Sequence, residues 1–127
     1  MTTLAVRGCG MVSALGYNAP SSLAALRAGV SAVRSLPWLD PESGEPLRGA
    51  KVDLPQWWEG VGKLADLLAP AIDECLRAAD IPATEIPILL GVAERSRPAR
   101  FADLDTELLN AVQAKLEVRQ HPLSCLY

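Results

Sequence analysis

The sequence predicts a single α/β domain with a mainly parallel sheet and packed helices. The continuous apolar run at residues 86–92, Ile-Pro-Ile-Leu-Leu-Gly-Val, has the length of a strand. Such runs are typical of strands that are buried on both faces of a parallel sheet. Helical patterns also alternate with extended segments along the 127 residues, as they do in α/β proteins. This length fits one domain.

The chain is expected to open with a short strand that runs into a glycine-rich turn. Leu4 and Val6 alternate with other residues, as one face of a strand requires. Glycines follow at positions 8, 10 and 16. Without a Cβ atom, these positions let the backbone turn tightly or approach a neighbour closely.

A helix is predicted over residues 20–28. Asn18 is a favourable N-cap, Pro20 suits the first turn, and Gly29 is a stop signal. Residues 30–36 are either a loop or a weak extended piece. Residues 37–55 contain six prolines and glycines, so they are expected to be a loop, with residues 50–52 as a candidate edge strand.

The clearest helix is predicted over residues 61–79. Apolar residues there recur every three or four positions, and Leu64, Leu68 and Ile72 belong to this stripe. Pro70 lies inside the pattern and is expected to kink the helix or restart it. A further helix is predicted over residues 102–116 and an extended tail over 118–127. The apolar stripe and residues 88–92 should meet in the core.

Composition excludes several classes of function. Half of the residues are hydrophobic and 21% are charged, which is typical of a folded globular protein. A net charge of −3 and the absence of basic runs argue against a nucleic-acid partner. No apolar run approaches the ~20 residues of a membrane span. Three separated cysteines and one histidine argue against disulfides and a zinc site, and favour the cytoplasm.

No cofactor site is predicted. The glycines at positions 8 and 10 invite comparison with a dinucleotide-binding loop, but the third glycine of that motif is missing. The acidic residue expected about twenty positions later is also absent, since Val33 and Arg34 stand there. We therefore interpret the segment as a structural strand-to-loop turn.

Three stretches resemble the amino-terminal half of the β-ketoacyl synthases of the thiolase superfamily. Residues 6–16 contain Gly-x-Gly-Met-Val-Ser-x-Leu-Gly, and residues 21–33 contain Leu-x-Ala-Gly-x-Ser-x-Val. Residues 71–81 match a helix of the type Ala-x-x-Glu-x-Leu-x-x-Ala-x-Ile, followed by Ile-Leu-Leu-Gly at 88–91. Asp80 stands where the family has a glycine. The resemblance implies one partial thiolase-like domain over residues 1–127.

The resemblance implies acyltransferase chemistry, but its nucleophile motif is missing. Such synthases attack an acyl thioester with a cysteine that lies among small residues and has a lowered pKa. Cys125 is the nearest cysteine in chain order, yet its neighbours are bulky, so it is interpreted as a packing residue rather than a nucleophile. His121 matches none of the family's motifs and is interpreted as a surface or packing residue. No catalytic residue is therefore predicted.

Three functions remain in view. The first is a catalytically incomplete synthase-like protein that acts as an adaptor, accessory or regulatory subunit. The second is a fragment or subunit of a β-ketoacyl-ACP synthase whose catalytic half lies elsewhere. The third is a carrier-protein or acyl-chain binding module. Expected partners are another chain or a second copy, with an acyl carrier protein as a further candidate.

Five residues are candidates for partner contact. Trp57 and Trp58 either pack internally or anchor a partner, because tryptophan is enriched at binding hot spots. Arg95, Arg97 and Arg100 follow the predicted buried strand. Because sites in α/β sheets form beyond the carboxyl ends of strands, these arginines could meet a phosphate or an acidic partner. The alternative is a solvated loop.

Overall fold

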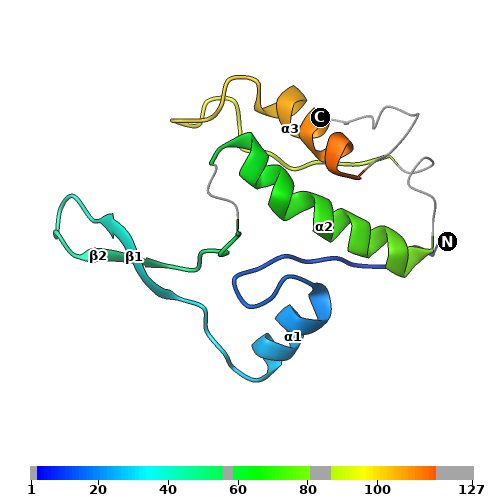
Figure 1. The fold of residues 1–127 in the computed structure, drawn as a ribbon, viewed down its shortest axis with the longest axis horizontal. Coiled ribbons are helices and arrows are strands. Elements are labelled where there is room, and N and C mark those ends of the chain that lie inside the picture. Colours follow the sequence, from blue (N-terminus) through cyan, green and yellow to red (C-terminus); the bar gives the residue numbers. More distant parts are fainter. Residues whose placement is uncertain (1–2, 56–58, 81–86, 117–127) are drawn as a thin grey trace.

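The computed structural model describes residues 3–55, 59–80 and 87–116. Within these ranges the chain forms three helices and one two-stranded antiparallel sheet (Figure 1). In chain order the elements are α1 (Ala19–Arg27), β1 (Arg34–Leu39), β2 (Pro46–Gly49), α2 (Val61–Ala79) and α3 (Leu104–Leu116).

The predicted α/β fold with a mainly parallel sheet is wrong, and with it the expected thiolase-like domain. The only sheet in the described ranges is the antiparallel pair β1–β2. Residues 4–7 form no strand, and the described part of the apolar run, residues 87–92, lies outside the sheet. A run buried on both faces needs neighbouring strands. Here Leu90 and Val92 pack against the helices while Leu89 is 75% exposed.

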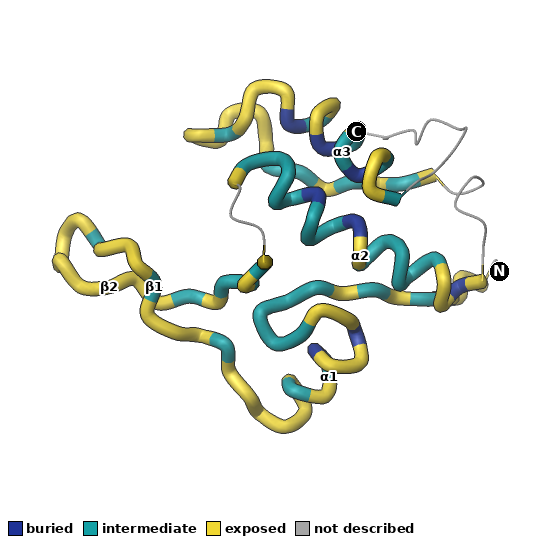
Figure 2. The backbone as a smooth tube through the Cα atoms, in the orientation of Figure 1, coloured by how far each residue is buried: buried dark blue, intermediate teal, exposed yellow. Residues whose placement is uncertain are grey.

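The core lies between α2 and α3. Buried Ala65 of α2 meets Leu104, Leu108 and Val112, which project from one face of α3 at helical spacing. The residues that pack around this cluster come from both helices and from residues 90–92 (Figure 2). The predicted contact between the α2 stripe and this part of the apolar run is thereby confirmed, although the run is not a strand.

Helix α2 has the predicted bounds and continues through Pro70. The helix therefore does not restart there, although proline removes one backbone hydrogen bond. Pro70 is exposed, so its ring lies on the surface of the helix. The helix ends at Asp80, which adopts a left-handed conformation with φ of 53° and donates its N–H to the carbonyl groups of Leu76 and Arg77.

Helix α1 begins within one residue of its predicted start. The Asn18 side chain accepts a hydrogen bond from the Ser21 N–H at 2.8 Å, which satisfies a free donor of the first turn. Pro20 stands at the start of the helix, where its missing N–H costs nothing. Helix α3 begins two residues later than predicted and ends at the predicted residue.

The predicted loop at residues 37–55 is also wrong, because β1 and β2 form a hairpin there. Arg34 pairs with Gly49 and Leu39 with Pro46, with an irregularity between these ends. Gly44 closes the turn with φ of 71°. Both strands are edges, so each tolerates a proline. The candidate edge strand at residues 50–52 is not formed.

Candidate functional site

The segment at residues 6–12 runs along α2 and contacts it through glycines (Figure 1). A Cβ atom on Gly10 would lie 1.8 Å from the carbonyl oxygen of Ala71, and one on Gly8 would lie 2.7 Å from that of Cys75. Neither distance is compatible with a side chain. The two glycines therefore allow the backbone to rest directly on the helix. We call this contact the glycine seam.

The carboxylate of Glu74 joins the seam to α1. It accepts hydrogen bonds from the backbone N–H of Met11 at 3.0 Å and from that of Ala19 at 3.0 Å. Ala19 is the first residue of α1, whose N–H groups lack partners within the helix. A negative charge at this end also complements the helix dipole. One side chain of α2 thus holds two other segments in place.

A serine pair closes the loop between the seam and α1. The hydroxyl groups of Ser13 and Ser22 lie 2.8 Å apart, and the Ser22 hydroxyl donates to the carbonyl oxygen of Gly16 at 3.0 Å. Ser22 is buried, so this bond satisfies a polar group away from water. The residues that suggested a dinucleotide loop and a synthase motif are therefore engaged in internal packing.

A cleft of about 690 Å³ opens beside this unit. It lies between the glycine-rich segment, α2 and the residues that follow β2, and its lining consists of Val12, Tyr17, Asp53, Leu54, Pro55, Asp66 and Pro70. The Tyr17 hydroxyl donates to the backbone carbonyl of Asp53 across it. The mixture of apolar side chains with two carboxylates suits an apolar group that carries a polar or cationic end.

Both carboxylates of the cleft have a basic neighbour. The Asp53 carboxylate accepts from the Arg34 guanidinium at 2.6 and 2.7 Å, and this hydrogen bond lowers the pKa of Asp53. The carboxylate of Asp66 pairs with Lys115 of α3. The cleft therefore carries little uncompensated charge.

The three candidate arginines have different environments. The Arg100 side chain is 6% exposed, donates to the carbonyl oxygen of Ala93 at 2.8 Å and pairs with Asp105. It holds the loop at residues 94–100, which we call the arginine loop, against α3. Arg95 is 83% exposed and lies 3.7 Å from Asp105, and Arg97 is exposed. Arg95 and Arg97 are thus the two that face solvent.

Other predicted residues lie outside the described ranges, namely Trp57, Trp58, His121, Cys125 and the tail at 118–127. A further candidate for partner contact is Trp38 of β1, whose side chain is half exposed. The ammonium group of Lys51 lies over its ring, 5.5 Å from the ring centroid, in a cation–π contact. The sequence does contain a signal for the hairpin that carries Trp38. Asp-Pro-Glu-Ser-Gly-Glu-Pro, at residues 40–46 between two leucines, is a turn sequence.

The comparisons with known proteins add no constraint: no family model, curated protein or solved structure matches the chain. Among the described residues, no helix is long and apolar enough to cross a membrane. The same residues hold no group of three or more histidine, cysteine or acidic side chains that could bind a metal ion.

Proposed function

We propose that this chain acts through protein contacts, as an adaptor, accessory or regulatory subunit. The observation that carries the proposal is its surface. Among the described residues, twelve large apolar side chains are exposed, from Leu4 at 93% to Met11 at 39%. Exposed apolar side chains on several elements are what an assembling subunit leaves for its partners to cover.

Large apolar side chains contribute to this surface. Leu4 and Val6 are 93% and 92% exposed, and they continue the line of the glycine seam past the end of α2. Others lie on α1, on the hairpin and before α3, among them Leu26, Trp38, Leu39, Leu47 and Phe101. Single exposed apolar residues are ordinary, but exposure on several elements favours an interaction surface.

The resemblance to β-ketoacyl synthases suggests which assemblies to examine first. We propose that the partner belongs to an acyl-transferring system, with an acyl carrier protein as one candidate. The contacts support a structural use of the shared residues, because Gly8 and Gly10 pack on α2 and Glu74 fixes α1. A chain that shares these sequence stretches could be recognised by the same partners without performing the condensation.

The proposal is tested by comparing the purified chain with the same chain in its native assembly, by sedimentation, proteolysis and hydrogen exchange. We expect the chain alone to sediment either as an assembly larger than 13.5 kDa or as an expanded, protease-sensitive monomer. In the native assembly, residues 3–7 and the hairpin should become protected from hydrogen exchange. A compact, protease-resistant monomer at micromolar concentration would overturn the proposal.

A second candidate function is that of a subunit of a β-ketoacyl-ACP synthase. It is favoured by one observation: the stretches that carry the resemblance contact one another, through the glycine seam, Glu74 and the serine pair. Offering an acyl thioester to the native assembly separates the candidates. An acyl group found by mass spectrometry on a partner chain favours the synthase, and no acylated chain favours the adaptor.

A further inference from the structure

The hairpin of β1 and β2 projects from the body of the molecule as an arm (Figure 1). Its strands contact each other extensively, whereas the other extensive contact between described elements joins α2 to α3. Trp38, Leu39 and Leu47 on the arm are all exposed. Figure 2 shows most of the arm as exposed. Because an isolated two-stranded hairpin is marginal in water, the arm needs a surface to rest on.

The tip of the arm is acidic and the arginine loop is basic. Asp40, Glu42 and Glu45 lie at or beside the turn, while Arg95 and Arg97 face solvent on the loop. Within the described ranges neither Glu42 nor Glu45 belongs to an ion pair. The chain thus displays two exposed patches of opposite charge. In the basic patch, Arg95 also lies 3.7 Å from Asp105 of its own copy, and Glu94 is exposed beside it.

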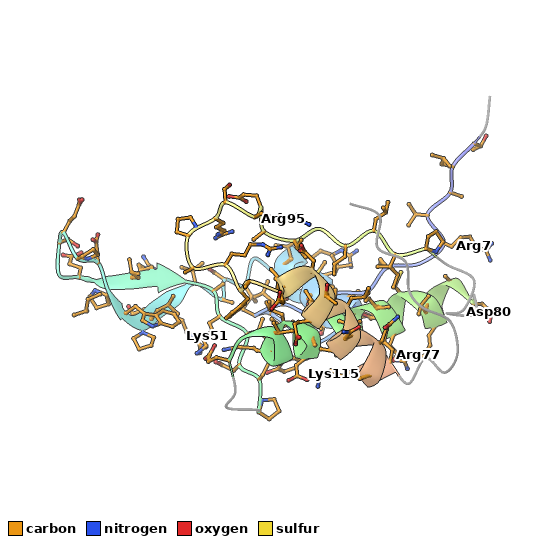
Figure 3. All side chains as sticks on the ribbon, turned by 90° about the horizontal axis from the view of Figure 1, so that it is seen from above. Arg7, Lys51, Arg77, Asp80, Arg95 and Lys115 are labelled. Atoms are coloured by element: carbon orange, nitrogen blue, oxygen red, sulfur yellow. The ribbon has the colours of Figure 1, made fainter. Side chains whose placement is uncertain are left out.

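The placement of these two patches suits a symmetric pair of chains. The arm and the arginine loop lie toward the same side of the molecule, and Arg95 marks the loop in the view from above (Figure 3). A two-fold axis beside them would bring each arm to the other copy's loop.

We propose that the arm of one copy docks on the arginine loop of a second copy, and reciprocally. This inference rests on the proposed function, and it names the first partner as the chain itself. Glu42 and Glu45 of each copy pair with Arg95 and Arg97 of the other. The exposed apolar residues of the arm are covered in the same interface.

Charge reversal tests the pairing. Sedimentation equilibrium of the full chain is measured for wild type, E42R/E45R, R95E/R97E and the four-site combination, with circular dichroism to verify folding. We expect each double variant to weaken dimerisation at least tenfold and the combination to restore it. The control R27E reverses an exposed arginine on α1 that belongs to none of the ion pairs of the described residues, and it should leave the dimer unchanged. Raising the salt concentration should weaken the wild-type dimer.

The outcomes separate this inference from the proposed function. A wild-type dimer that survives both reversals, or is not restored by the combination, overturns the docking. A wild-type monomer that still enters a native assembly with other proteins also overturns it but leaves the proposed function standing. A compact wild-type monomer outside any assembly overturns both.

Discussion

At the residue scale, the most informative positions are those where a side chain would not fit. Gly8 and Gly10 were recognised from sequence as sites of tight turning or close approach, and close approach is what they provide. The sequence did not reveal which element comes near, because that element, α2, lies more than sixty residues along the chain. Glu74 likewise acts on Met11, 63 residues away, and on Ala19, 55 residues away.

The substitution Gly10→Ala should destabilise the protein by about 1–3 kcal/mol or more, because the new methyl group would collide with the backbone of α2. Gly91→Ala is the matched control. A Cβ atom there meets nothing within 4 Å, so stability should hold or rise by about 0.4–1 kcal/mol. Urea unfolding midpoints measure both changes. Equal midpoints for the two variants would contradict the glycine seam.

Arg34→Gln should raise the pKa of Asp53 toward its ordinary value, because the hydrogen bond from the Arg34 guanidinium is the main cause of the lowering. A carboxyl whose pKa is lower when folded stabilises the protein above its unfolded pKa, near 3.9. That stabilisation is lost as the pH falls through the folded pKa. Wild type and R34Q should therefore differ in stability at neutral pH and converge in acid.

Carboxyl carbon NMR titration checks this pKa change, and Asp40 serves as the internal reference. The pKa of Asp40 is lowered chiefly by the backbone N–H of Glu42 in the hairpin turn, so R34Q should leave it unchanged. A shift of both carboxyls would mean that the hairpin had unfolded. An unmoved Asp53 would mean that the ion pair is absent in solution.

At the scale of elements, the helices could be predicted from sequence and the strands could not. Helices α1 and α2 follow from local signals: the Asn18 cap, the proline at the first turn and the apolar stripe of residues 61–79. The hairpin was missed because Pro37, Gly44 and Pro46 resemble loop punctuation. Edge strands tolerate the same residues, and only pairing across the turn distinguishes the two cases.

The prediction of a buried strand at residues 86–92 was wrong for a different reason. Its composition fits a strand buried on both faces, but burial depends on what lies beside it. Leu90 and Val92 face the core formed by α2 and α3, whereas Leu89 points outward. This alternation of buried and exposed side chains is what an extended segment shows when it packs on a pair of helices. Local pattern alone does not separate this arrangement from a central strand.

Pro70→Ala should stabilise helix α2. The helix continues through Pro70, so alanine would restore the missing backbone hydrogen bond without changing the fold. Propensity differences set an upper bound of about 3 kcal/mol for this gain. Thermal unfolding of the two proteins measures it. An unchanged or lower midpoint would show that the proline ring contributes more through the cleft that it lines than it costs in the helix.

At the scale of the whole molecule, the exposed apolar side chains of the described residues support the proposed function. The sequence correctly placed part of the core, yet gave no measure of how much chain would remain uncovered. The predicted contact residues were also incomplete. Arg100 is engaged within its own loop, while Trp38 and the acidic turn were not singled out. A projecting arm arises from how elements are placed, which no single segment encodes.

A dimer held through this surface should show stability that depends on protein concentration. Unfolding coupled to dissociation is opposed by mass action, so raising the concentration a hundredfold should raise Tm by about 5 °C for chains of this size. Calorimetry at 1 and 100 µM measures the difference. E42R/E45R, whose arm tip is reversed in charge, should show a smaller rise of Tm over the same range. A wild-type Tm that does not move over this range would mean that the folded chain is stable alone, and that the exposed apolar residues of its arm are not covered by a second copy.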